Sequence, residues 1–320
     1  MRRGRVLVVG SVNCDVSVRA PRLPRPGETV LGSASTVSVG GKGFTQAAAA
    51  DAIGAVTRFV GAVGKDPFGE RVVGRLMALG FDTAWLKTVE DIPTGVAAIT
   101  VDDDGTNAIA VAPGANAAVD PAQVGRALES MTPDVLLVQL EIPVPVTVAA
   151  LAMARERGIT TVLNPAPADP AILDHLKLVD ILTPNEHELS VLTGMSCDDI
   201  LADGNSFEQA VRQLQGHGGG IVVVTRGERG CAAFDGRRFI YLPAFAVETV
   251  DTTGAGDVFN GALAAAIAAG IGLAEAMEQA SAAAAISTTR RLAEGSAPDM
   301  DEVLALMAGK VSSGENRQCT

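Results

Sequence analysis

The sequence predicts an α/β protein with three layers: helices, a mostly parallel central sheet, and helices again, with a small β-sheet attached as a lid. Short runs of Val, Leu and Ile alternate with longer helical patterns, which is typical of a parallel sheet covered on both faces. Two segments break this alternation and predict the lid. The length of 320 residues suffices for one large domain with a smaller appendage.

The strands of the main sheet are expected where the apolar runs are short. They are residues 6–12, 59–63, 135–140, 161–163, 181–183 and 221–225, with helices at 44–53, 67–79, 121–130, 146–157 and 207–215. The helix at 121–130 has a clear start, because Asp120 can cap it and Pro121 fits the first helical position. After the sixth strand, residues 230–234 and 237–245 predict antiparallel edge strands, and helices follow at 257–269, 273–289 and 300–307.

The lid is expected from residues 15–39 and 95–111. Residues 15–39 are rich in Pro, Arg and Thr, and residues 95–111 have the pattern of two strands joined by an Asp104-Gly105 turn. The α/β core then comprises residues 1–14, 40–94 and 112–309. The polar residues 310–320 are expected to form a disordered tail.

Composition argues against several classes of protein. The formal net charge of −12 disfavours a nucleic-acid partner, although a helix N-terminus can still bind a phosphate group. The 4 cysteines form no CxxC pair and the 3 histidines are scattered, so we predict neither a zinc site nor a redox motif. No apolar run reaches the roughly 18 residues that cross a bilayer. We therefore expect no membrane partner and a cytoplasmic location.

The most specific chemical signal is the stretch TVDTTGAGDVFNGAL at residues 249–263. Gly254, Ala255 and Gly256 can present backbone N–H groups at the start of a helix, where the helix dipole favours an anion. Asp257 would stand beside that anion as a general base, and transfer of a phosphoryl group to an alcohol requires this combination. The plainer alternative is a glycine loop followed by a favourable first-turn acid.

Two stretches in the first half of the chain predict contacts with a small ligand. In GGKGFTQ at residues 40–46, glycines on both sides of Lys42 allow close approach to the backbone. The pattern is neither a Walker A loop nor a dinucleotide fingerprint. Asn13 and Asp15 follow the first strand, at the edge where open α/β sheets bind ligands. A glycine-rich turn and an Asx-type turn are the respective alternatives.

Two stretches in the second half predict a site for a nucleotide and its metal. Asn185 and Glu188 have the spacing of a helix capping box, and the same pair could organise the water shell of Mg²⁺. The buried run at 222–225 leads into a glycine turn at Gly227, which could approach nucleotide phosphates. On its own, this second signal is weak.

These stretches also match a known family, in order and with few gaps. The motifs are GSVNCD, RPGETV, GGKG, TGVAAI, GANAA, QLE, LNPAPA, LVDILTPNE, TRGERG and DTTGAGDVFNGAL, and together they span about residues 5–300. The chain resembles the ribokinase-like (PfkB-type) sugar kinases. This resemblance implies the ribokinase-like fold, with the β lid over a sugar, and a homodimer formed through the lid strands.

The resemblance also implies a role for each of several residues. Those around the sugar would be Asn13, Asp15, Gly41, Lys42, Thr45, Glu141 and Asp257. Those around ATP would be Asn185, Thr225, Gly227, Gly230, Gly256 and Ser281, with Glu188 arranging Mg²⁺ through water. Asp257 would be the base and Gly254, Ala255 and Gly256 the anion hole. A monovalent cation, typically K⁺, would bind near Asp251, the Thr253 carbonyl, Ser287, Arg290, Leu292 and Ser296.

Three places depart from the family pattern. Thr45 replaces a usual Asn and is too short to reach a sugar hydroxyl in the same way, and Phe44 beside it replaces a small residue. Ser281 stands where an Asn or His usually flanks the adenine. Leu292 replaces a glycine of the cation loop. These changes bear on the acceptor, the nucleotide and the K⁺ dependence, respectively.

The expected function is transfer of the γ-phosphate of ATP to the primary hydroxyl of a pentose, with D-ribose to ribose 5-phosphate as the default. Phe44 and Thr45 suggest an alternative within the family: a kinase of 2-deoxyribose, another furanose, a ketohexose or a nucleoside. A third interpretation is a protein that binds sugar or nucleotide without turnover. It would need a broken catalytic set, whereas the sequence retains Asp257, Glu188 and the anion hole.

Overall fold

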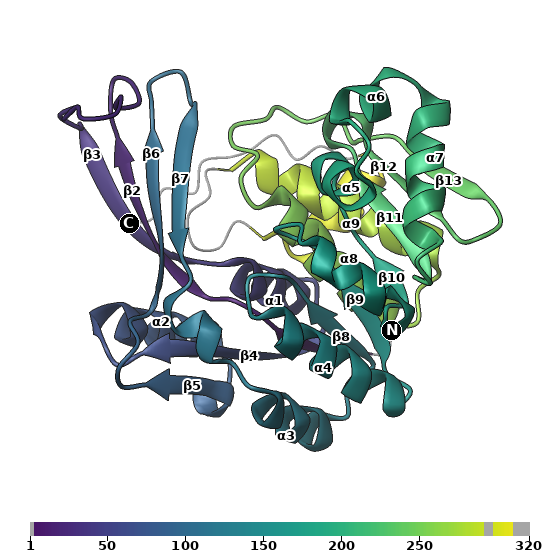
Figure 1. Ribbon diagram of the computed structural model, residues 1–320, viewed down its shortest axis with the longest axis horizontal. Helices are drawn as coiled ribbons and strands as arrows, with labels where there is room; N and C mark the ends of the chain where they lie inside the picture. Colours follow the sequence, from purple (N-terminus) through teal and green to yellow (C-terminus); the bar gives the residue numbers. More distant parts are fainter. Residues whose placement is uncertain (1–2, 291–296, 310–320) are drawn as a thin grey trace.

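The computed structural model describes residues 3–290 and 297–309. Within them, a main sheet has nine strands in the order β13-β12-β11-β10-β9-β8-β1-β4-β5 (Figure 1). These strands are β1 Arg5–Val9, β4 Val56–Gly64, β5 Leu86–Val89, β8 Val135–Val138, β9 Thr160–Leu163, β10 Ile181–Leu182, β11 Ile221–Thr225, β12 Cys231–Phe234 and β13 Phe239–Leu242. The run from β5 to β11 is parallel, and β12 and β13 add antiparallel edge strands. The predicted fold class is confirmed.

Helices cover both faces of this sheet. They are α1 Lys42–Ala52, α2 Pro67–Ala78, α3 Pro121–Met131, α4 Val144–Glu156, α5 Glu186–Thr193, α6 Cys197–Ala202, α7 Gly204–Gln215, α8 Ala255–Ala268, α9 Leu273–Thr288 and α10 Met300–Met307. Side chains alternate along β1, so that Val6 and Val8 join one core with α1, α2 and α8–α10. Leu7 and Val9 join the other core with α3–α7. Burial on both faces explains why the strands are continuously apolar.

Helices α1 and α8 pack with their backbones close together. A Cβ atom at Gly261 of α8 would lie 2.3 Å from the carbonyl oxygen of Gln46 and 2.7 Å from Cβ of Ala49. Only glycine permits this approach of one helix backbone to the other. The alanine-rich stretches of the sequence therefore place the start of α8 at a fixed position relative to α1.

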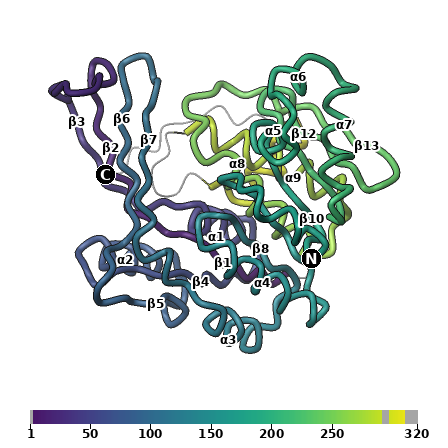
Figure 2. Tube along the Cα trace, viewed as in Figure 1, coloured from purple at the N-terminus to yellow at the C-terminus, as the bar shows by residue number. Residues whose placement is uncertain are grey.

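The lid is a second sheet of four described strands in the order β3-β2-β6-β7. They are β2 Asn13–Arg19, β3 Ala34–Gly40, β6 Gly95–Val101 and β7 Asn107–Ala112. Figure 2 shows β2 and β3 beside β6 and β7, at one end of the molecule. The predicted hairpin of β6 and β7 is confirmed, and Gly105 in its turn has a φ of 83°, which glycine adopts at little cost.

The first strand is shorter than the sequence predicts, because the chain leaves the main sheet at Gly10. Backbone of α1 packs directly against this point: a Cβ atom at Gly43 would lie 2.7 Å from Gly10. The chain then enters β2 of the lid at Asn13. The same apolar run thus supplies a core strand and the connection that joins the core to the lid.

Candidate active site

The candidate site residues follow the carboxyl ends of the parallel strands. Asn13 comes after β1, Glu141 after β8, Asn185 after β10 and Gly227 after β11. In parallel strands these ends lie at the same edge of the sheet, where open α/β folds bind their ligands. The topology therefore collects residues from distant parts of the sequence at one edge.

Asn13 and Asp15 lie where the lid meets the core. The Asn13 side chain is buried, and its Oδ1 accepts a hydrogen bond of 2.8 Å from Nδ2 of Asn116. Asn116 is held in turn by the backbone N–H of Val12, at 2.9 Å. Asp15 is half-buried, and burial together with the nearby charge of Glu141 raises its pKa to about 6.

Two lid glycines leave room for these polar side chains. A Cβ atom at Gly40 would lie 2.0 Å from Oδ2 of Asp15, and one at Gly95 would lie 2.2 Å from Oδ1 of Asn13. Either contact would displace the polar group. Both glycines belong to motifs of the family resemblance, GGKG and TGVAAI, and the structure gives a physical reason for glycine at each position.

Glu141 is fixed by the loop before α1. Its Oε2 accepts hydrogen bonds from Oγ of Ser11 at 2.5 Å and from the backbone N–H of Lys42 at 3.2 Å. Gly41 has a φ of 96°, and a Cβ atom there would lie 2.8 Å from Cα of Val12. Glycine is therefore required at this position for the chain to turn so close to β1.

Lys42 stands among three carboxylates. The negative charge of Asp257 is the largest cause that raises the pKa of Lys42. The charges of Glu141 and Glu188 also raise this pKa, and burial lowers it. The pKa of Asp257 is also raised, mainly by burial, against the opposing effects of Lys42 and of a hydrogen bond from Gln46. The site thus holds a partly desolvated carboxylate next to a stably charged ammonium group.

The start of α8 has the form of an anion site. Gly254 caps the helix in the left-handed conformation, with a φ of 75°, and the N–H of Ala255 donates to the Thr252 carbonyl at 3.2 Å. Gly256 and Asp257 occupy the second and third helical positions, whose N–H groups precede the helical hydrogen bonds. A Cβ atom at Gly256 would meet no atom within 4 Å, so the first turn of α8 is open on the side of this residue.

Of the residues expected around ATP, the structure brings together Asn185 and Thr225, which form a parallel bridge beyond the ends of β10 and β11. Gly227 has a φ of 54° and open space around its Cα. Glycine is needed at position 230 for a different reason: a Cβ atom there would lie 2.1 Å from the carbonyl oxygen of Leu242 on β13. Packing between the edge strands therefore already requires this glycine.

Glu188 and Asn185 form the capping box that the sequence predicts. Asn185 Oδ1 accepts from the Glu188 N–H at 2.8 Å, and Glu188 Oε2 accepts from the Asn185 N–H, also at 2.8 Å. Burial raises the pKa of Glu188 to about 6, although Asn185 and Lys42 oppose this shift. Nδ2 of Asn185 donates to the other carboxylate oxygen at 3.0 Å. A carboxylate held in this way fits a metal ion through an intervening water better than by direct coordination.

The residues expected around a monovalent cation lie close together in part. The backbone N–H of Asp251 donates to the Thr288 carbonyl at 3.0 Å, next to Ser287, and Oδ1 of Asp251 accepts from the Thr253 N–H at 2.9 Å. The side chain of Arg290 pairs with Glu302 of α10.

Two other residues of this expected set, Leu292 and Ser296, lie outside the described residues. Among the residues that are described, no group of three or more His, Cys, Asp and Glu side chains is arranged to hold a metal ion.

Three of the residues that depart from the family pattern lie in the described part of the chain. Phe44 is 4% exposed and belongs to the hydrophobic core that packs against α1. Thr45 is half-buried on the same turn of α1. Ser281 lies on α9, where its Oγ is 3.3 Å from Sγ of Cys231.

Sequence reasoning missed three buried polar residues that hold the site together. Ser11 holds Glu141, Asn116 holds Asn13, and Gln46 donates a hydrogen bond of 2.8 Å to Oδ1 of Asp257. All three lie inside the GSVNCD, GANAA and GGKGFTQ stretches. A polar side chain on an otherwise alanine-rich helix, as at Gln46, was the available signal.

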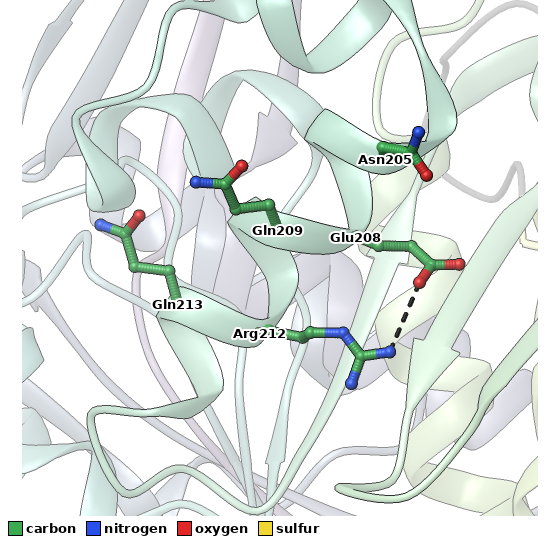
Figure 3. Close-up of a pocket in the computed structure, with 5 residues that line it drawn as sticks. All are labelled: Asn205, Glu208, Gln209, Arg212 and Gln213. Atoms are coloured by element: carbon green, nitrogen blue, oxygen red, sulfur yellow. Dashed lines mark hydrogen bonds and ion pairs between the residues drawn. The ribbon is translucent and has the colours of Figure 1, made fainter.

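A surface hollow of about 500 Å³ lies apart from this site, along α7. Figure 3 shows its lining residues: Asn205, Glu208, Gln209, Arg212 and Gln213. Glu208 and Arg212 form an ion pair at 3.4 Å across one helical turn. No candidate site residue contributes to this hollow, which is a shallow polar helix face.

None of the helices in the described part of the chain combines the length and apolar character needed to cross a bilayer.

A partly desolvated carboxylate beside a helix start that could accept an anion is the arrangement that transfer of a phosphoryl group to an alcohol requires. Comparison with known proteins gives the family. The chain belongs to the pfkB family of carbohydrate kinases, whose sequence profile matches residues 3–300.

The curated relatives and solved structures agree with this family. The ribokinase of Haemophilus influenzae is 35% identical over 306 residues, covering 95% of this chain and 99% of the relative. A deoxyribokinase of Salmonella typhi is 32% identical over 299 residues, covering 93% and 96%. The structure of Arabidopsis thaliana ribokinase in complex with ribose and ATP has a TM-score of 0.84 and 32% identity, covering 96% of this chain and 99% of that one.

Proposed function

We propose that this protein is an ATP-dependent kinase that phosphorylates the primary hydroxyl of D-ribose to give ribose 5-phosphate. The observation that carries the proposal is Asp257, a half-buried carboxylate in the first turn of α8 that accepts a hydrogen bond from Gln46 and lies near the Lys42 ammonium group. Ribose and ATP are the ligands of the Arabidopsis relative, and the Haemophilus relative is a ribokinase. As an ATP-dependent kinase, the protein uses the nucleotide together with a divalent metal.

In this proposal the sugar lies between the lid and the core. Asn13, Asp15 and Glu141 bind the ring hydroxyls, for which ionised carboxylates are good acceptors. The Gly41 backbone and the Lys42 side chain complete the sugar site, and Thr45 lies beside it. The lid strands then exclude water from the acceptor, which strengthens every electrostatic interaction inside.

The chemical step needs one proton acceptor and one set of donors. Asp257 takes the proton of the acceptor hydroxyl as that oxygen bonds to the γ-phosphorus, while the bond from this phosphorus to the bridging oxygen of the β-phosphate breaks and ADP leaves with the electron pair. Amides of the loop Gly254, Ala255 and Gly256, together with the helix dipole, stabilise the charge on the transferred phosphoryl group. Lys42 compensates the negative charge that collects there. The proton remains on Asp257 until the product leaves.

The nucleotide would lie over the ends of β10 and β11. Asn185, Thr225 and Gly227 line its phosphates, with Gly230 shaping the turn, and Ser281 lies near the adenine. The divalent ion is proposed to be Mg²⁺, held by the phosphates and through water by Glu188. It would neutralise phosphate charge. A K⁺ ion near Asp251, Thr253, Ser287 and Arg290 would hold the anion-hole loop in place.

Thr45 favours a second candidate, phosphorylation of 2-deoxyribose. Thr45 is shorter than the Asn that is usual in the family, so a hydroxyl of ribose could lose a hydrogen bond here. A sugar without that hydroxyl has no such hydrogen bond to lose, so its binding would be weakened less by Thr45. The 32% identical deoxyribokinase supports the same alternative.

Coupled ADP release distinguishes these acceptors. With MgATP, kcat/KM is measured for ribose, 2-deoxyribose, a ketohexose and a nucleoside, each in K⁺ and in Na⁺. The proposal predicts the highest kcat/KM for ribose and faster turnover in K⁺. A higher kcat/KM for 2-deoxyribose than for ribose would show that 2-deoxyribose is the acceptor. Saturable ligand binding without ADP formation on any acceptor would contradict kinase activity altogether.

A further inference from the structure

A network of hydrogen bonds between buried polar side chains includes Asp257. Nε2 of Gln139 donates to Oε1 of Gln46 at 2.5 Å, and Nε2 of Gln46 donates both to Asp257 Oδ1 at 2.8 Å and to Asn164 Oδ1 at 3.1 Å. Gln46 and Gln139 are 0% exposed and Asn164 is 6% exposed. Burial of so many amides is costly unless they are paired, so these hydrogen bonds hold one another in place.

The network continues past Asn164 and returns to the start of α8. Nδ2 of Asn164 donates to the Thr183 carbonyl at 3.0 Å, and the Thr183 hydroxyl donates to Oδ1 of Asn260. Nδ2 of Asn260 then donates to the carbonyl of Gly256 at 2.8 Å. Gly256 precedes Asp257, so the hydrogen bonds form a closed ring around the first turn of α8.

The direction of the hydrogen bonds in this ring is fixed by chemistry. An ionised carboxylate only accepts hydrogen bonds, so Gln46 must turn its amide nitrogen toward Asp257 and its oxygen toward Gln139. The second proton on that nitrogen then goes to Asn164, which must turn its own nitrogen toward Thr183. The orientations of the Gln46 and Asn164 amides are therefore fixed by their partners, whereas Oε1 of Gln139 is buried without a hydrogen-bond partner among the described residues.

This arrangement leaves the two oxygens of Asp257 unequal. Gln46 occupies Oδ1, so Oδ2 is the oxygen that remains for another partner. Lys42 attracts the same carboxylate, as the shift in its pKa shows. Without the hydrogen bond from Gln46, the carboxylate would be free to rotate toward the ammonium group, where it is a poorly aligned base.

We propose that Gln46 is a positioning residue for phosphoryl transfer: it holds Oδ1 of Asp257 and reserves Oδ2 for the acceptor hydroxyl. Through Asn164, Thr183 and Asn260, the same ring holds this carboxylate at a fixed position relative to the amides of the anion hole. The inference rests on the proposed function, because it requires Asp257 to be the general base.

The test replaces Gln46 with Met, which has a similar volume and cannot donate a hydrogen bond. We expect kcat for ribose to fall roughly ten- to one-hundred-fold, because a misplaced base loses rate without loss of binding. KM for ribose and for MgATP should stay within about twofold of wild type, since the hydrogen bonds of Gln46 reach Asp257 and no other residue proposed to bind the sugar or ATP. Steady-state kinetics and isothermal titration calorimetry measure the two effects separately.

Gln123→Met is the matched control. Gln123 is also buried, and its Nε2 donates to the carbonyls of Gly61 at 2.9 Å and Trp85 at 2.7 Å, away from the site. Loss of these hydrogen bonds should lower the unfolding temperature but leave kcat within about twofold. Equal losses of kcat in both variants would mean that buried glutamines act on stability alone, and the inference would fail.

A double-mutant cycle separates the inference from the proposed function. If Gln46 acts through Asp257, Gln46→Met should change kcat less than twofold in an Asp257→Asn background. A normal kcat in Gln46→Met, with Asp257→Asn inactive, would overturn the inference and leave the proposed function intact. Full activity of Asp257→Asn would contradict the proposed function itself.

Asn260→Ala provides a second variant if Gln46→Met fails to fold. It removes the hydrogen bond to the Gly256 carbonyl on the other side of the ring and introduces a good helix former. The inference predicts a fall in kcat of about tenfold with KM preserved. Unchanged kcat in a folded Asn260→Ala variant would contradict a role for the ring.

Discussion

At the scale of single residues, burial raises the pKa values of three carboxylates in the candidate site. Asp15, Glu188 and Asp257 all have raised pKa values, and burial is the largest cause for each. Sequence motifs identified these carboxylates but could not give their protonation behaviour. That property depends on which side chains and backbone atoms surround them in the folded chain.

The raised pKa of Asp15, about 6, predicts a pH dependence of sugar binding. Asp15 gains its charge as the pH rises through 6, and the charged form accepts hydrogen bonds at both oxygens and more strongly than the protonated form, which uses one oxygen as a donor. KM for ribose should therefore fall as the pH rises from 5 to 7 and then level off, with a change of about tenfold per pH unit below the pKa. Initial rates across this pH range measure it.

Asp15→Asn is the control for this titration. The variant should bind ribose more weakly and show no inflection near pH 6 in the KM for ribose. Glu188 also titrates at about 6, but its effect belongs to the KM for MgATP. A KM for ribose that is independent of pH in the wild type would remove Asp15 from the proposed sugar site.

The partners that hold the candidate residues were beyond sequence reasoning. Ser11, Gln46 and Asn116 lie within the recognised motifs, yet nothing in their spacing says that they face Glu141, Asp257 and Asn13. Such pairs lie as far as 211 positions apart in the sequence. Only the packing of α1 against α8, and of β1 beside β8, brings them within hydrogen-bonding distance.

At the scale of secondary structure, periodicity and capping predicted the long elements well. The strand at 221–225 and the helix at 300–307 have the predicted bounds, and α3 begins at the Asp120 cap, whose side chain accepts from the Gln123 N–H. Short elements were missed. Strand β5 is only partly buried and α6 has six residues, so neither carries a distinct apolar period.

The approach of α8 to α1 gives a prediction at this scale. In Gly261→Ala, the new Cβ atom would lie 2.3 Å from a backbone oxygen of α1, so the helices must separate. We expect a loss of about 1–3 kcal/mol in the free energy of unfolding. Urea denaturation followed by circular dichroism measures it.

Gly74→Ala is the matched control, because Gly74 is an exposed residue within α2 where a Cβ atom would meet nothing within 4 Å. This substitution should instead stabilise the protein by about 0.5–1 kcal/mol, through the better helix propensity of alanine. Equal stability of the Gly261→Ala variant and wild type would show that α1 and α8 can move apart at no cost.

At the scale of the whole molecule, the lid is the feature that the main sheet does not explain. Its outer strand β7 is exposed along its length, and Ile109 and Val111 are 51% and 50% exposed. By strand register, Val111 lies on the same face as Asp15, two strands away. The division of the chain into core and lid segments and the cytoplasmic location stay predictions from the sequence.

Exposed apolar side chains on this outer strand support the proposed homodimer. Burial of such a surface against a second lid is favourable, and the edge strand needs protection. We expect the wild type to sediment as a dimer at micromolar concentration and Ile109→Lys to sediment as a monomer. Leu31→Lys is the control, since Leu31 is 87% exposed and lies outside the lid strands. A monomeric wild type would contradict the proposal.

The most direct test of the account is the turnover of Asp257→Asn with ribose and MgATP, measured beside its affinity for ribose. A general base contributes about 10²–10⁴ in rate, so kcat should fall by that factor. The dissociation constant for ribose, from calorimetry, should stay within a few-fold of wild type. Near-normal turnover in this variant would show that Asp257 is not the base and that the proposed mechanism is wrong.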